Sequence, residues 1–274
     1  MPTRSGFFEV QAKSSRIVGG PWLLASLLGL GACGGQPETA GLTFEDPEVS
    51  PVVAAAEPSG AAPTEGTVPR GCVAPKGVSG SPGTLSEVLT LINALPHPVT
   101  IPCFLESLER PLQVNATSSV FSAQPAVGNR SPRVFIFSGQ MVLSVVPDGL
   151  GRNFLESSQL TSATRSVKSE IEFPVDKPLG MADAFSRIPF NGASICGLCH
   201  AEERRVSVDG TPGGFESKAL KPRADTVVSV ESMRKESLIC DAAKEPERCA
   251  ILTALMAHGA VHERAFPTQM ETFF

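Results

Sequence analysis

The stretch that most constrains how this 274-residue chain can fold is the apolar run over residues 17–30. Arg4, Lys13 and Arg16 precede it, which is the charge arrangement of a secretory signal. The run is too short and too rich in glycine for a membrane span. We therefore expect residues 1–32 to be a cleaved signal peptide and the mature chain to fold in an oxidising compartment.

The run ends in the tetrapeptide Leu30-Gly31-Ala32-Cys33. A leucine and two small residues ahead of a cysteine resemble a bacterial lipobox. The resemblance implies cleavage before Cys33 and lipid attachment to that residue. The protein would then be bound to a membrane of the bacterial cell envelope, at the outer membrane or the periplasmic face. The alternative is an ordinary signal peptide followed by an incidental cysteine.

Residues 33–83 are rich in proline, glycine and alanine and show little periodicity. A segment of this composition does not supply the apolar surface of a packed core. We expect a disordered tether here, which would hold the folded body away from the lipid anchor.

The remainder is expected to be globular, because 42% of the whole sequence is hydrophobic. The net charge is −5 and no basic stretch dominates, so nucleic acid is not an expected partner. Thr84 and Glu87 have capping-box spacing ahead of apolar residues at helical intervals, which predicts a helix beginning near residue 84.

The segment from about 99 to 180 is expected to be mostly β structure. Residues 133–137 and 140–146 flank Ser138-Gly139, which predicts a hairpin covered on both faces. Residues 167–175 alternate between apolar and charged side chains, which indicates a strand with one solvated face. The apolar run at 99–104 fits a short strand, and residues 149–165 are rich in serine and threonine and predict a loop.

The last third is expected to be mostly helical. Helices are predicted at 181–187, 232–243 and 246–258, with a helical turn after residue 200 and a short strand at 227–230. The predicted fold class is therefore α+β, with a helix and a β-rich body over 84–180 and a mostly helical segment over 181–274.

The strongest chemical motif is Cys196-Gly197-Leu198-Cys199-His200. Two thiols at this spacing can add to the two vinyl groups of a haem while the adjacent histidine binds its iron. The motif resembles that of c-type cytochromes. Its place after a β-rich body resembles, more weakly, the β-sheet class of cytochromes c-prime. The resemblance implies a covalent haem c on Cys196 and Cys199, with His200 as the proximal iron ligand.

Such a haem would serve electron transfer, with another envelope redox protein as partner, or the binding and redox chemistry of a small ligand. Candidates for a distal iron ligand are Met270, Met256 and His258, although methionine in a helix is more often part of the core. In the β-sheet class the distal side can lack a protein ligand. The sequence holds no common hydrolase or nucleotide-binding motif, so we expect a carrier or binding protein rather than a dedicated enzyme, and we assign no catalytic residue.

Two other interpretations of the motif remain open. Cys196 and Cys199 could be bonded to each other in a disulfide-stapled surface lipoprotein that has a structural or binding role. The same pair could also hold zinc with His200 or with a later histidine, His258 or His262.

Seven cysteines occur in the chain. When the lipidated cysteine and the two in the motif are set aside, four remain, which are Cys72, Cys103, Cys240 and Cys249. An even number fits disulfide bonding in an oxidising compartment. Cys240 and Cys249 lie near the facing ends of two predicted helices, so we expect them to pair, and Cys72 with Cys103 follows by elimination. Three connectivities are formally possible.

Overall fold

The computed structural model describes residues 68–273. The expected signal peptide, Cys33 and residues 33–67 of the expected tether lie outside this range, so those predictions stay predictions. Within the range the fold is α+β, as the sequence indicates.

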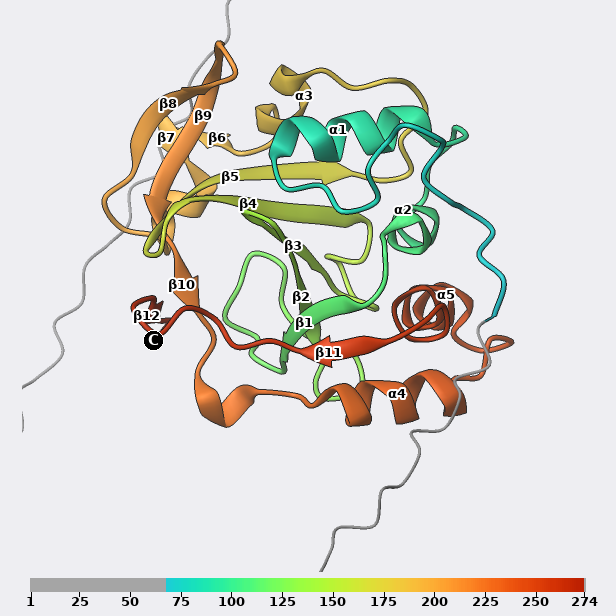
Figure 1. Ribbon diagram of the computed structural model, residues 1–274. Coiled ribbons are helices and arrows are strands. Elements are labelled where there is room, and N and C mark those ends of the chain that lie inside the picture. Colours follow the sequence, from blue (N-terminus) through green and yellow to red (C-terminus); the bar gives the residue numbers. More distant parts are fainter. Residues whose placement is uncertain (1–67, 274) are drawn as a thin grey trace, which may run out of the picture. The chain divides into compact units, whose positions relative to one another are not determined.

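An eight-stranded sheet with the order β11-β1-β2-β3-β4-β5-β9-β8 forms the centre of the fold (Figure 1). All neighbouring strands are antiparallel except β1 and β11. The strands are β1 (Leu112–Thr117), β2 (Arg133–Ser138), β3 (Met141–Val145), β4 (Phe154–Ser162), β5 (Arg165–Glu172), β8 (Arg204–Val208), β9 (Thr211–Lys218) and β11 (Val261–Glu263). Two shorter sheets pair β6 (Pro189–Phe190) with β7 (Ala193–Ser194) and β10 (Leu220–Lys221) with β12 (Glu271–Thr272).

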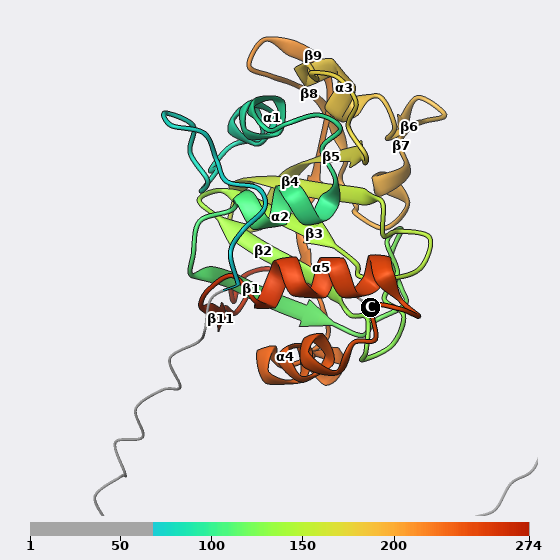
Figure 2. The same ribbon diagram turned by 90° about the vertical axis from the view of Figure 1, so that its right-hand side faces the viewer.

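Three helices cover one face of the sheet, and Figure 2 shows them in front of it: α1 (Leu85–Ala94), α2 (Ile101–Ser107) and α5 (Pro246–Met256). The short α3 (Met181–Phe185) packs against β5 and β9, and α4 (Val230–Ile239) packs against α5, β1 and β11. None of the described helices is both long and apolar enough to cross a membrane.

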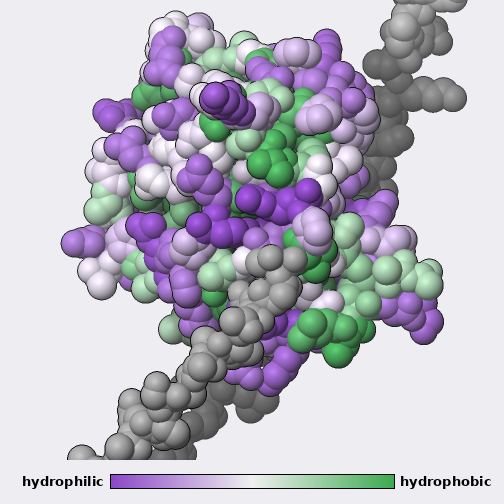
Figure 3. Space-filling model, turned by 45° about the vertical axis from the view of Figure 1, so that its right-hand side comes forward, coloured by the Kyte–Doolittle hydropathy of each residue, from purple (hydrophilic) through white to green (hydrophobic). Residues whose placement is uncertain are grey.

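The surface seen in Figure 3 is mainly hydrophilic, with small separate hydrophobic patches. The apolar side chains are instead gathered in one core between the helices and the sheet, where Phe104, Ile136 and Leu143 are fully buried. Burial of this apolar area is the main force that holds the two layers together.

The start of α1 follows the predicted capping box. The Thr84 side chain accepts a hydrogen bond from the Glu87 backbone N–H, and the Glu87 carboxylate accepts one from the Thr84 N–H. Two backbone donors that the helix leaves without partners are thereby satisfied. The predicted helices near the C-terminus are also confirmed as α4 and α5, with Pro246 in the first turn of α5.

The predicted hairpin is confirmed as β2 and β3, which lie in the interior of the sheet. Gly139 turns the chain between them with a φ of +54°. A Cβ atom at Gly139 would lie 2.7 Å from the Cα of Gly83, so both the backbone angle and the close approach require glycine. All five residues of β3 are buried, as expected for a strand covered on both faces.

Two predictions for the first half of the body are wrong. The run at 99–104 is not a strand, because Thr100 caps a helix through the Cys103 N–H and Pro102 fits its first turn, so α2 begins at Ile101. The predicted loop over 149–165 contains the nine-residue strand β4. Ser157 and Ser158 pair with both β3 and β5, and this pairing overrides the preference of serine for turns.

The last third is not mostly helical, and the predicted division at residue 180 does not separate two domains. Residues 204–208 form β8 rather than a helical turn, and residue 230 starts α4 rather than ending a strand. Strands β8, β9 and β11 all join the sheet built by the first half, through β5–β9 and β1–β11 pairs.

The expected tether is shorter than predicted, because residues 68–83 pack on the body. The Glu106 carboxylate accepts hydrogen bonds from the backbone N–H groups of Gly71 and Cys72. The Val68 N–H donates to the Ala257 carbonyl at 3.1 Å. The proline-rich composition gives no sign of these contacts, because they are made by backbone groups and by one disulfide.

Both expected disulfides are confirmed, Cys72–Cys103 and Cys240–Cys249. The first ties the residues ahead of α1 to α2. The second joins the end of α4 to α5, next to the buried Arg248, which forms ion pairs with Glu236 and Glu245.

Removal of each disulfide is predicted to lower stability according to the length of the loop that it closes. The sequence separations are 31 and 9 residues. The chain-entropy relation gives losses of about 4 kcal/mol for Cys72→Ser/Cys103→Ser and about 3 kcal/mol for Cys240→Ser/Cys249→Ser. Guanidinium unfolding of the two double variants would measure the difference, and a larger loss for the second pair would contradict the prediction.

Candidate functional site

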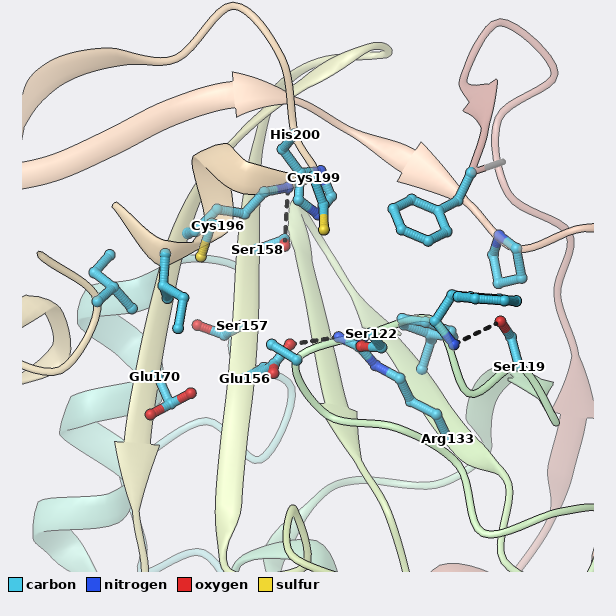
Figure 4. Close-up of a pocket in the computed structure, with 18 of the residues that line it drawn as sticks. Ser119, Ser122, Arg133, Glu156, Ser157, Ser158, Glu170, Cys196, Cys199 and His200 are labelled. Atoms are coloured by element: carbon cyan, nitrogen blue, oxygen red, sulfur yellow. Dashed lines mark hydrogen bonds and ion pairs between the residues drawn. The ribbon is translucent and has the colours of Figure 1, made fainter. Parts of the chain in front are cut away.

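A partly enclosed cavity of about 140 Å³ lies on the face of the sheet opposite α1, α2 and α5. The alternation of β2 shows this, since Val134 and Ile136 belong to the core while Arg133 and Phe135 line the cavity. Side chains of β1, β2, β4 and β5 form its floor. The loop over 118–123 and the segment over 188–200 form its walls (Figure 4).

The predicted haem motif forms one wall of this cavity. Cys196 lies in the short 3-10 helix η1 (Ile195–Leu198), and Cys199 and His200 follow directly. The N–H groups of Cys199 and His200 both donate to the Cys196 carbonyl, at 3.1 and 2.8 Å. This single turn brings the three side chains to one side, and Figure 4 shows them together at the cavity.

A tight hairpin leads into this turn. The strands β6 and β7 are joined by Asn191 and Gly192, which have φ angles of +48° and +83°. Positive φ at both central residues defines a type I′ turn, for which Asn-Gly is a preferred pair. Asn-Gly between two short extended segments indicates such a hairpin from sequence, although none was expected at these residues.

Ser194 and Glu203 hold the turn in place. The Ser194 hydroxyl accepts a hydrogen bond from the Gly197 N–H, while the Glu203 carboxylate accepts from both the N–H and the hydroxyl of Ser194. A Cβ atom at Gly197 would come within 2.9 Å of this carboxylate. A side chain in place of Gly197 would therefore displace the Glu203 carboxylate from this hydrogen-bonded position.

His200 is held in a defined orientation. Its Nδ1 lies 2.8 Å from the backbone carbonyl of Lys218, and a carbonyl only accepts, so Nδ1 carries the proton. Burial, reinforced by the charge of Lys168, lowers the pKa of His200 to about 4. The imidazole is therefore neutral near pH 7, with the lone pair on Nε2. A metal-binding histidine is typically oriented by this kind of hydrogen bond from its other nitrogen.

The two cysteines of the motif are free thiols, unlike the other four cysteines in residues 68–273. Burial raises the pKa of Cys196 to about 11, so that residue is protonated at neutral pH. Cys199 is exposed at the mouth of the cavity.

The cavity floor carries a buried cation, Lys168, which was expected on the solvated face of its strand. Lys168 on β5 is only 6% exposed, and its amine donates to the hydroxyls of Ser166 and Ser158. Burial lowers its pKa to about 8. Alternation alone could not identify this residue, because the segment that covers this face of β5 comes from residues 188–200, later in the chain.

The predicted distal ligands do not meet His200. None of Met270, Met256 and His258 lines the cavity. Met256 packs in the core on α5, and Met270 is buried just before β12. His258 binds the Val68 carbonyl through Nδ1.

Apolar side chains surround the mouth of the cavity. Phe121 lines the cavity from the loop over 118–123 and is 70% exposed, and Ile195 lines it from the segment over 188–200 and is also exposed. Phe135 and Ile188 continue the apolar lining inward. Large exposed apolar residues around a hollow are typical of a ligand-binding site.

Comparisons of the chain with models of protein families, with curated proteins and with solved structures found no match. Function is therefore inferred from the geometry of this cavity.

The two motif thiols are predicted to differ in reactivity. In the protein with no group bound, iodoacetamide at pH 8 should modify exposed Cys199 at least about tenfold faster than Cys196, which is partly buried and protonated. Mass spectrometry of the tryptic peptide 188–204 would follow both sites, with the disulfide cysteines as unreactive controls. Equal rates would contradict the described geometry.

Proposed function

We propose that the chain is an exported lipoprotein of the bacterial envelope that carries one covalent haem c in this cavity. The observation that supports the proposal most strongly is the convergence of Cys196, Cys199 and His200 on one cavity wall, with Nδ1 of His200 already engaged by the Lys218 carbonyl. A bound haem would supply an iron that exchanges single electrons or binds a small ligand.

The chain's own groups fit that attachment. Cys196 and Cys199 are free, and each can add its sulfur and its hydrogen across one vinyl double bond. His200 is neutral and presents Nε2, the atom left to bind iron. The exposed apolar side chains of Phe121 and Ile195, which line the cavity, would cover a macrocycle and exclude water from its faces.

The zinc interpretation receives less support. Among residues 68–273, the only three ligand atoms within 4.8 Å of one another belong to Cys240, Glu245 and Cys249, and those two sulfurs form a disulfide. The ligand atoms of Cys196, Cys199 and His200 are therefore more widely spaced than a tetrahedral zinc site requires. A haem, by contrast, separates its iron from the vinyl groups at its edge.

The lining favours small-ligand chemistry over simple electron shuttling. In the described part of the chain, no methionine and no histidine other than His200 lines the cavity. An iron held by His200 would then lack a methionine or histidine ligand on its distal side and could bind a small diatomic molecule or react with peroxide. Electron exchange with an envelope redox protein remains the second use of the same site.

Covalent attachment is the first prediction of this proposal. The full chain, expressed with a haem-attachment system, should keep its haem after denaturation and give a c-type pyridine haemochrome spectrum. Cys196→Ala/Cys199→Ala should lose the covalent haem, while His262→Ala, at an exposed histidine outside the cavity, should be unchanged. A colourless wild-type protein would overturn the proposal.

Lipid anchoring is tested separately. Replacement of Cys33 by alanine should move the protein from the membrane fraction to the soluble fraction, because the lipid acceptor is lost. Cell fractionation of wild type and Cys33→Ala would measure this, with Cys240→Ser/Cys249→Ser as a control that keeps the acceptor. Membrane retention of Cys33→Ala would count against the anchor but not against the haem.

A further inference from the structure

Four charged side chains line the cavity, and all except Lys168 form an ion pair. Two carboxylates are already paired: Glu156 with Arg133 at 2.5 Å, and Glu170 with Arg187 at 2.9 Å. Lys168 is the remaining cation.

Lys168 forms no ion pair among residues 68–273, although Glu156, which is paired with Arg133, is close enough to attract its charge. Its amine has two hydroxyl partners, Ser166 and Ser158, and no carboxylate within 4.0 Å in residues 68–273. An ammonium has three N–H donors, so one donor is left over. A charge with 6% exposure and no ion partner is costly unless a ligand compensates it.

The position of Lys168 places this charge within the site. It lies on β5, in the floor of the cavity whose wall holds Cys196 and His200. Its positive charge contributes to the lowered pKa of His200. The amine and the side chains of the motif therefore line one and the same cavity.

We propose that Lys168 pairs with a carboxylate of the ligand in this cavity. The identity of that ligand rests on the proposed function, under which the carboxylate is a haem propionate. A single amine with neighbouring hydroxyls matches one singly charged carboxylate, which can accept hydrogen bonds from both Lys168 and Ser158.

The haem-loaded protein gives the first test. Lys168→Met removes a positive charge beside the iron, which favours the more positive ferric state. We expect the ferrous–ferric equilibrium to shift about tenfold toward ferric, a fall of about 59 mV in midpoint potential. Lys168→Arg keeps the charge and should stay near wild type. Lys235→Met, at an exposed lysine of α4, is the matched control.

The absorption spectrum separates two roles for the amine. If Lys168 pairs with a propionate, the ferric spectrum of Lys168→Met should retain the wild-type spin state. A change of spin state would instead make the amine an iron ligand and overturn the proposal, as would an unchanged midpoint potential. Lys168→Gln repeats the charge removal in case the methionine variant folds poorly.

A haem-free test keeps this inference separate from the proposed function. The full chain, produced without haem attachment, is titrated with protoporphyrin IX and with its dimethyl ester, and porphyrin fluorescence reports binding. We expect the diacid to bind about tenfold more tightly than the diester, and Lys168→Met to remove that preference. Equal binding of the two porphyrins to wild type would overturn the inference. If the preference is present but no covalent haem forms, only the proposed attachment fails.

Discussion

Four residue pairs between β5 and β9, from Arg165–Lys218 to Lys168–Phe215, attach the last third of the chain to the sheet, and the cavity depends on them. The pairing sets Lys168 in the floor and brings the Lys218 carbonyl to Nδ1 of His200. Glu216 reinforces it. Burial raises the pKa of Glu216, but hydrogen bonds from Arg204, Thr161 and Arg165 outweigh it and hold this pKa at about 2. Because these donors lie on β8, β4 and β5, the single carboxylate on β9 joins β8 and β9 to the β4–β5 hairpin.

A tight turn and a few short-range hydrogen bonds then give the wall of the cavity its shape. The Asn191-Gly192 turn reverses the chain, and Ser194 and Glu203 fix the helical turn that follows. Two thiols and an imidazole on a flexible loop would adopt many relative orientations. The hydrogen bonds of Ser194 and Glu203 restrict the turn and so reduce the conformational entropy that is lost when a ligand binds. Phe121 and Ile195 line the open hollow beside this turn, and a flat apolar ligand would cover both side chains.

Local signals in the sequence were sufficient for the elements that depend on near neighbours. The Thr84 capping box, the Gly139 hairpin and both disulfides could be predicted because their determinants lie within a few residues or follow from counting cysteines. Strands β4, β8 and β9 could not, since their polar residues form strands only through partners distant in sequence. The Cys-x-x-Cys-His motif could be recognised in the sequence. The position of Lys168 in the cavity and that of Met256 in the core could not, because both depend on tertiary packing.

The central claim is that the sulfurs of Cys196 and Cys199 hold a haem, and the mass of the tryptic peptide 188–204 from protein purified out of the bacterial envelope tests it most directly. The account predicts this peptide with the added mass of one haem, bound through both sulfurs. A peptide lighter by two hydrogens would show a disulfide between the cysteines, and an unmodified peptide would show free thiols. Either of these results would contradict the account.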